Sequence, residues 1–331
     1  MATMTTATTN FDKTVTALVR KEILKELRTR TMWLQESQAV DGEFVPGTDT
    51  MRFVAYRDLS VTTNNNTIAA GTQPWLQEGT APSEEALSIN YEEFTCGQAG
   101  RLLGITDKAL KINPHRLSEI AAERIGRNAA ATVDLYVGNV INAGTDRTVY
   151  PSTITQRTNI ASTSIITANL VRKTVAVLKD ANVEPFADGF YRSVISPLVS
   201  YDLMVETATG GWLDVQKYAS PDTILRGEIG RFAGVRFLEG NVANLFANAS
   251  NGAGSTGTVD VYSTVVYGPN FFTFGDIQTI ETYFVRPGGD HTDPLAQKAL
   301  FGWKGMWGAR LLNSVGARYA RIETASSIGA N

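Results

Sequence analysis

The stretch KALFGWKGMWGARLL, residues 298–312, decides the fold class, because its residue spacing separates a strand from a helix. Its odd positions carry only apolar residues or glycine, Trp303 and Trp307 among them, whereas its basic residues all fall on even positions. Alternation with a period of two is typical of a strand. A helix would contain three interior glycines, each about 1 kcal/mol less favourable than alanine. We therefore predict a strand.

The same stretch mixes basic and aromatic residues, a combination that can also bind nucleic acid through stacking and phosphate contacts. Here the tryptophans share the strand face that carries Ala299 and Leu311. That arrangement favours core packing of the tryptophans.

The composition of the whole chain is that of a globular protein, with 331 residues, 43% of them hydrophobic and 19% charged. A net charge of −3 excludes a strongly basic nucleic-acid binder. No apolar run of membrane-spanning length and no signal-peptide pattern is present, so we expect folding in a cytoplasm. The single cysteine, Cys96, excludes an internal disulfide framework, and we expect it to be half-buried in a strand.

The first hundred residues predict an arm followed by a long hairpin. Residues 11–35 show the apolar spacing of an amphipathic, locally basic helix. Residues 50–59 and 86–98 alternate like strands and flank a polar segment that contains Trp75 and Leu76. Because isolated two-stranded hairpins are marginally stable in water, this hairpin must lie on something else, and a neighbouring subunit is the natural candidate.

The next segment predicts one long helix over residues 114–143. Asn113 is placed to cap it, Pro114 occupies its first turn and Gly144 follows its end. Thirty residues would form a rod of roughly 45 Å. A stripe of apolar residues runs along one side of it from Leu117 to Val140.

The second half of the chain predicts a mixed α/β region. Helices are expected over 167–182 and 197–208, and strands over 189–196, 235–240, 259–276 and 278–287. Ala233–Gly234 marks a tight turn, and the Asn- and Gly-rich segment 245–259 is expected to be a surface loop.

No pattern predicts catalysis. The chain lacks phosphate-binding glycine motifs, and Ser255 lacks the first glycine and the preceding strand of a nucleophile elbow. Asp290, His291 and Asp293 are the weak candidate for a metal site, but a turn cap before Pro294 is the favoured interpretation. Consecutive carboxylates such as Glu92–Glu93 would point to opposite faces of a strand. We therefore expect a protein that is not an enzyme and has no cofactor.

Three segments carry a family resemblance: LRGEIGRFAGVRFLEG (225–240), VVYGPNFFTFGDI (265–277) and DPLAQKALFGWKGMWGARLLN (293–313), the last followed by ARYARIET (317–324). Together with the order of predicted elements, they resemble the major capsid protein of tailed phages, of the Hong Kong 97 type. The closest similarity is to the coliphage N-four type. Some family members begin with a long removable scaffolding segment, whereas here only about forty residues precede the hairpin.

The resemblance implies an α+β fold with five parts. These are an N-terminal arm (1–45), an extended hairpin loop (46–100), a peripheral domain with a spine helix (101–159), an axial α/β domain (160–272) and the C-terminal strands of the peripheral domain (273–331). The implied subunit-interface residues are Arg57, Trp75, Leu76 and Glu78 in the hairpin and Arg28 and Arg30 in the arm.

The implied function is self-assembly, as hexamers and pentamers, into an icosahedral shell around double-stranded phage DNA. A separate scaffolding protein, a portal at one vertex and a decoration protein are the further partners it suggests, with only weak, non-specific DNA contact and no membrane. The location would be the virion capsid, after assembly in the host cytoplasm. Two alternatives stay open: the shell of a bacterial encapsulin nanocompartment, and a hydrolase that uses Ser255.

Overall fold

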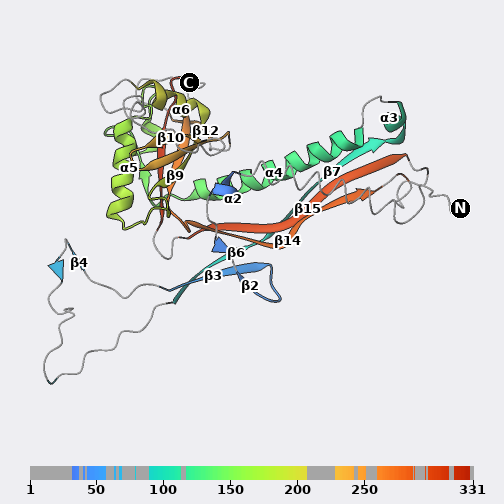
Figure 1. Cartoon of the computed structure of the whole chain (residues 1–331), viewed down its shortest axis with the longest axis horizontal. Coiled ribbons are helices and arrows are strands. Elements are labelled where there is room, and N and C mark those ends of the chain that lie inside the picture. The colour runs from blue at the N-terminus through green and yellow to red at the C-terminus, as the bar shows by residue number, and fades with distance from the viewer. Residues whose placement is uncertain are drawn as a thin grey trace.

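The computed structural model describes most of the chain from residue 89 onward and parts of the chain before it. The described residues are 32–36, 40–41, 43–56, 63–64, 67–68, 79, 89–112, 117–206, 228–241, 245–250, 259–285, 287, 295, 297–312 and 317–328. The molecule is elongated, with an α/β layer at one end and a long helix lying beside long strands at the other (Figure 1).

The α/β layer is a seven-stranded sheet with helices packed against it. Its central path runs β10-β11-β9-β13-β16-β8, and β12 also pairs with β13. The strands are β8 (Thr148–Val149), β9 (Tyr191–Ile195), β10 (Glu228–Phe232), β11 (Val235–Glu239), β12 (Leu245–Ser250), β13 (Val259–Tyr267) and β16 (Tyr319–Thr324). The helices are α5 (Ala168–Asp180), α6 (Pro197–Val205) and the short 3₁₀ helix η1 (Arg157–Asn159).

Local sequence explains several boundaries of this layer. Thr167 caps α5, since its side chain accepts a hydrogen bond from the Leu170 backbone nitrogen at 3.3 Å. Pro197 opens α6 directly after β9, as the sequence predicted. The predicted turn at Ala233–Gly234 joins β10 to β11, with both residues at positive φ (50° and 83°), which is the backbone of a tight hairpin turn.

The other region, here called the spine layer, is a four-stranded sheet with a long helix against one face (Figure 1). Its strand order is β1-β14-β15-β7. The elements are β1 (Val40–Asp41), β7 (Gly97–Thr106), β14 (Phe272–Val285), β15 (Lys298–Leu311), α3 (Asp107–Ile112) and α4 (Leu117–Ala143). The opening stretch is therefore a strand, and its odd positions from Ala299 to Leu311 are all buried, as predicted.

The helix α4 covers the buried face of β15 with a stripe of residues four apart. The stripe consists of Ala121, Ile125, Ala129, Val133, Val137 and Ile141, so Ile141 replaces the predicted Val140, which is only partly buried. The predicted cap at Asn113 and Pro114 lies outside the described residues. Gly144 follows the helix end, where a side chain would overlap the Tyr319 hydroxyl, so close approach explains this glycine.

The predicted hairpin is present at its base, here called the hairpin root. It comprises β2 (Glu43–Phe44), β3 (Thr50–Tyr56) and β6 (Ile89–Thr95), and β3 pairs with β6 in antiparallel register from Thr50↔Thr95 to Tyr56↔Ile89. Two further two-residue strands, β4 (Thr63–Asn64) and β5 (Thr67–Ile68), pair with each other.

The structure differs from the sequence predictions in three respects. Residues 245–250, predicted as loop, form β12, because Phe246 and Ala249 pack on a small apolar cluster with Val259 and Val261. Cys96 is fully buried and lies between two strands, β6 and β7, instead of half-buried within one. Strand β7 itself was not predicted. The last strand, β16, pairs with β13 in the α/β layer.

Candidate functional site

The residues that the sequence analysis predicted to be functional all lie outside the described part of the structure. Those residues are Arg28, Arg30, Arg57, Trp75, Leu76 and Glu78 for subunit contacts, Asp290, His291 and Asp293 for a metal, and Ser255 for hydrolysis. These assignments therefore stay predictions.

The described residues do offer three other features that bear on function. Within them, no group of three or more His, Cys, Asp and Glu side chains is arranged to hold a metal ion. None of the helices described is both long and apolar enough to cross a membrane.

The first feature is the apolar contact that fixes the hairpin root on the spine layer. Met51 and Phe94, from β3 and β6, are buried together with Cys96, and Ile277 and Met306 pack against them. Burial raises the pKa of the Cys96 thiol, and nearby acidic groups raise it further, so this cysteine is a packing residue and not a reactive one.

Glycines on the spine layer make this contact close. A Cβ at Gly308 would lie 2.7 Å from Phe94 Cδ2 and 2.9 Å from the Thr95 carbonyl oxygen, and one at Gly275 would overlap Met51 Sδ. The hairpin root therefore rests directly on the backbones of β14 and β15.

Charged groups border the same contact. Arg310, on β15, pairs with Glu92 at 2.7 Å and donates to the Glu93 carbonyl oxygen at 2.6 Å. Glu93 instead pairs with Arg52 across the hairpin. The two consecutive carboxylates thus engage different partners, as expected for neighbours in a strand. A cavity of about 660 Å³ adjoins these groups, between the hairpin root, the end of α4 and β15.

The second feature is the face of the spine layer that points away from α4. Strand register places Tyr283, Gly302 and Leu102 in one row across β14, β15 and β7. Leu102 and Tyr283 are 63% and 43% exposed. Small residues in this area leave a groove of about 620 Å³ along β7 and β15. In the described residues β7 is the edge of this sheet, so its outer backbone groups face outward.

The third feature is a buried charge cluster in the α/β layer. Glu323 is 0% exposed and receives two hydrogen bonds from Arg157, at 2.8 and 2.6 Å, and an ion pair from Arg321 at 2.9 Å. Arg321 also donates to the Asn142 carbonyl oxygen at 2.5 Å, at the end of α4.

The charges of this cluster pair with one another and hold neighbouring elements of the fold together. The hydrogen bond to Glu323 raises the pKa of Arg157, while burial lowers the pKa of Arg321, although guanidinium groups stay charged in proteins. The Arg157 guanidinium also lies 3.6 Å from the Phe246 ring centre. The cluster links η1, β12, β16 and α4, and contains no unengaged nucleophile or acid that could act on a substrate.

Sequence reasoning missed this cluster and a second buried acid, Asp134 on α4. Both carry a readable signal. Arg321 and Glu323 are two apart inside an otherwise apolar strand, so they share a face, and Asp134 interrupts the apolar stretch of α4 between Val133 and Leu135.

No family model matches the sequence, and no curated protein matches it. Solved structures do match. The chain is similar to the capsid of Ralstonia phage GP4, with 13% identity, 89% of this chain and 87% of that chain covered, and a TM-score of 0.64. The capsid of cyanophage Pam1 gives 14% identity, coverage of 92% and 93%, and a TM-score of 0.64. A virus-like particle from Pyrococcus furiosus gives 11% identity, coverage of 92% of this chain and 97% of that chain, and a TM-score of 0.50.

These similarities define the class of fold. The chain has the mixed α and β fold of Hong Kong 97-type phage capsid proteins, and the match extends over about nine-tenths of each chain. The predicted fold class is therefore confirmed. The identities are too low for the match to establish more than the fold.

Proposed function

We propose that this chain is the major capsid protein of a tailed phage, which self-assembles as hexamers and pentamers into an icosahedral shell around double-stranded DNA. The observation that carries the proposal is the likeness to the phage GP4 and Pam1 capsids along nearly the full length of both chains. A protein of this kind acts by packing, so a structural role without catalysis is part of the proposal.

The described surfaces support assembly. In the spine layer α4 covers one face of the sheet. The hairpin root covers only part of the other face, where Leu102 and Tyr283 are exposed. The hairpin root is fixed on its own subunit, and the proposal assigns the rest of the 46–100 hairpin to a contact with another. In the proposal this hairpin lies over the open face of a neighbour, with Trp75 and Leu76 as apolar anchors and Arg57 and Glu78 beside them.

The proposed domain division follows from this arrangement. The arm (1–45), with Arg28 and Arg30, would clamp neighbours or face inward, and the axial domain (160–272) would meet its copies around five- and six-fold centres. Peripheral segments 101–159 and 273–331 would join adjacent capsomers, with β16 as the exception that returns to the axial sheet. Hexamers and pentamers need the same surfaces to meet at different angles, and a hairpin on a rigid root can absorb that difference.

The other partners are proposed from chemistry and resemblance. A net charge of −3 suits a wall that does not grip the packed DNA, since a strongly basic lining would hold it. A separate scaffolding protein, a portal and a decoration protein belong to the same proposal, as do assembly in the host cytoplasm and residence in the virion. The coliphage N-four type is the proposed subtype, on the strength of segments 225–240, 265–277 and 293–313.

The second candidate is the shell of an encapsulin nanocompartment. It draws on the likeness to the Pyrococcus furiosus virus-like particle, whose TM-score of 0.50 is lower than the 0.64 of the two phage capsids. An enzyme cargo, in place of a portal and DNA, would favour it. The hydrolase hypothesis requires an activity that disappears when Ser255 is replaced.

The test is negative-stain electron microscopy of the concentrated protein, with and without a co-expressed candidate scaffold from the same source. We expect shells, tubes or ring-shaped capsomers in at least one condition. Persistent monomers in both conditions would overturn the proposal and direct attention to a metal assay on Asp290, His291 and Asp293.

A further inference from the structure

A short segment near the N-terminus lies at the junction between the two layers. It consists of residues 32–36 and includes the one-turn helix α2 (Trp33–Glu36). Figure 1 shows α2 beside α4, close to the point where that helix approaches the α/β layer. Three separate contacts attach this segment to the junction.

The first contact is with Asp134, a side chain of α4 that is only 2% exposed. One carboxylate oxygen accepts the backbone N–H of Met32 at 2.7 Å, and the other accepts the backbone N–H of Trp33 at 3.1 Å. Burying a carboxylate is costly unless it is hydrogen-bonded. Within the described residues, these two N–H groups are the donors that compensate Asp134.

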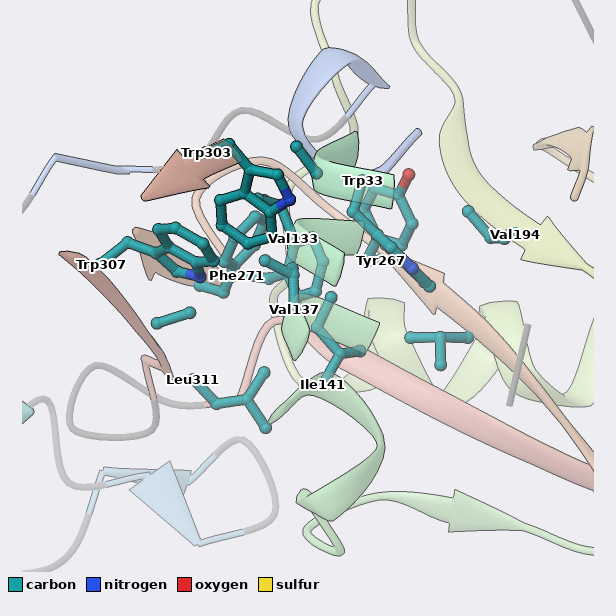
Figure 2. Packing of buried hydrophobic residues seen from close by; sticks show 14 of the residues in the cluster. Trp33, Val133, Val137, Ile141, Val194, Tyr267, Phe271, Trp303, Trp307 and Leu311 are labelled. Atoms are coloured by element: carbon teal, nitrogen blue, oxygen red, sulfur yellow. The ribbon is translucent and has the colours of Figure 1, made fainter. Parts of the chain in front are cut away.

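The second contact is the Trp33 side chain, which is 1% exposed. Its ring lies 6.1 Å from the Tyr267 ring at the end of β13. Figure 2 shows Trp33 in the same apolar cluster as Val133 and Val137 of α4 and Val194 of β9. Trp33 therefore fills space between the helix of one layer and the strands of the other.

The third contact is at Gly240, which follows β11. A Cβ at this position would overlap Met32 Sδ and lie 2.9 Å from Met32 Cε. The segment thus touches α4, the end of β13 and the residue that follows β11 within two consecutive residues.

We propose that residues 32–36 are a latch that fixes the angle between the spine layer and the α/β layer and couples that angle to the preceding arm residues, 1–31. If the segment leaves, Asp134 loses both donors and the Trp33 site loses a large side chain, so partial release is unfavourable. A pull on residues 1–31 is then transmitted to the junction. The proposal rests on the proposed function only in that neighbouring subunits would supply the pull.

The first measurement is hydrogen exchange by mass spectrometry on the soluble full chain. Replacing Asp134 by Asn keeps the shape but puts an N–H₂ group against one of the two backbone donors. We expect exchange in residues 32–36 to become about tenfold faster or more. Glu119→Gln, on the exposed side of the same helix, is the matched control and should leave exchange unchanged.

The second measurement separates a latch from a passive cover. Spin labels at Lys108 of α3 and Lys179 of α5, both exposed, report the distance between the two layers. Buried Cys96 resists labelling. The distance distribution should be narrow in the wild type and Glu119→Gln, and broad in Asp134→Asn.

Faster exchange with an unchanged distance distribution would overturn the latch, as would unchanged exchange in Asp134→Asn. Gly240→Ala is a second variant, in case Asp134→Asn does not fold. It displaces Met32 without altering the Asp134 carboxylate, and it should also broaden the distribution of distances between the two labels. Both measurements use isolated subunits, so they succeed or fail independently of whether shells form.

Discussion

The two layers of the molecule meet their packing needs in different ways. The α/β layer has helices on its central sheet, and its buried charge cluster, Arg157–Glu323–Arg321, is paired within the subunit. The spine layer is covered by α4 on one face, while Leu102 and Tyr283 stand exposed on the other. In the described residues, the central sheet of the α/β layer is packed against helices, whereas the second face of the spine layer is covered only in part, by the hairpin root.

Under the proposed function, that difference separates residues that stabilise the subunit itself from residues that are available for contacts between subunits. Substitutions in the α/β layer should lower the free energy of unfolding of the isolated subunit, because the interactions they remove lie within one subunit. Substitutions on the exposed part of the spine layer, around Leu102 and Tyr283, should mainly lower the melting temperature of the proposed particle. Four experiments test this division, the first three in order of expected effect on the isolated subunit.

Replacing Glu323 by Ala should have the largest effect. It would leave Arg321, which is 2% exposed, without its carboxylate partner. Removing one partner of a buried ion pair costs about 3–5 kcal/mol, and the free energy of unfolding in denaturant measures it. Glu93→Gln, which breaks the exposed pair with Arg52, should cost about 1 kcal/mol or less. Equal losses in the two variants would contradict the comparison.

Replacing Gly308 by Ala tests the seam between the hairpin root and the spine layer. The new Cβ would press on Phe94 and on the Thr95 carbonyl, and overpacking of this kind costs about 1–3 kcal/mol. We expect faster hydrogen exchange in residues 89–95 and little change in β9 or β13. Gly97→Ala is the control for added volume alone, since a Cβ there would meet no atom within 4 Å. A uniform loss of protection after Gly308→Ala would mean that the hairpin root is part of the global core.

Replacing Leu102 by Ser tests the open face. The side chain is 63% exposed, so the free energy of unfolding of the subunit should change by less than about 0.5 kcal/mol. The melting temperature of assembled particles should nevertheless fall, because an apolar contact between subunits is lost. Ile112→Ser, on α3 and 69% exposed, removes a similar side chain away from that row. Particles that melt alike in the wild type and in both variants would count against this face as an interface.

Changing the pH alone tests the junction between the layers. Burial raises the pKa of Asp134 above its ordinary value of 3.8, although the hydrogen bonds from Met32 and Trp33 act in the opposite direction. A raised pKa in the folded state means that the contribution of this group to stability is full below pH 3.8 and is lost as the pH rises through the raised value. The difference in unfolding free energy between the wild type and Asp134→Asn should therefore shrink or reverse over that range. A difference that is independent of pH would contradict the assignment.

Much of this fold could be predicted because local rules agree with the tertiary structure. Alternation predicted β15, an apolar stripe of residues about four apart predicted α4, and the helix expected from Pro197 matches the start of α6. Strand β7 escaped prediction because its sequence, GQAGRLLGIT, does not alternate. It is an edge strand with mostly exposed side chains, so no buried face imposes a pattern.

The functional residues were harder to predict than the fold. Strand β12 was mistaken for a loop because Asn248 and the Asn- and Gly-rich sequence that follows suit a turn, whereas its pairing with β13 makes it a strand. Asp134 stands alone in an apolar stripe, and its partners are backbone groups about a hundred residues away, which no local pattern encodes. The nominated contact residues, such as Trp75, rest on resemblance and await a test.

The junction between β6 and β7 has a mechanical consequence. Only Cys96 separates the last residue of the hairpin strand from the first residue of the sheet edge, and its backbone N–H is bonded to the Asp49 carbonyl oxygen at 2.9 Å. A load applied to the hairpin therefore enters the spine layer along the chain itself and spreads into β15 through ten registered pairs of β7, from Gly97↔Trp307 to Thr106↔Lys298. Tension along β7 loads the hydrogen bonds between β7 and β15 in shear and all at once, so we expect the hairpin to resist being pulled away from its own subunit.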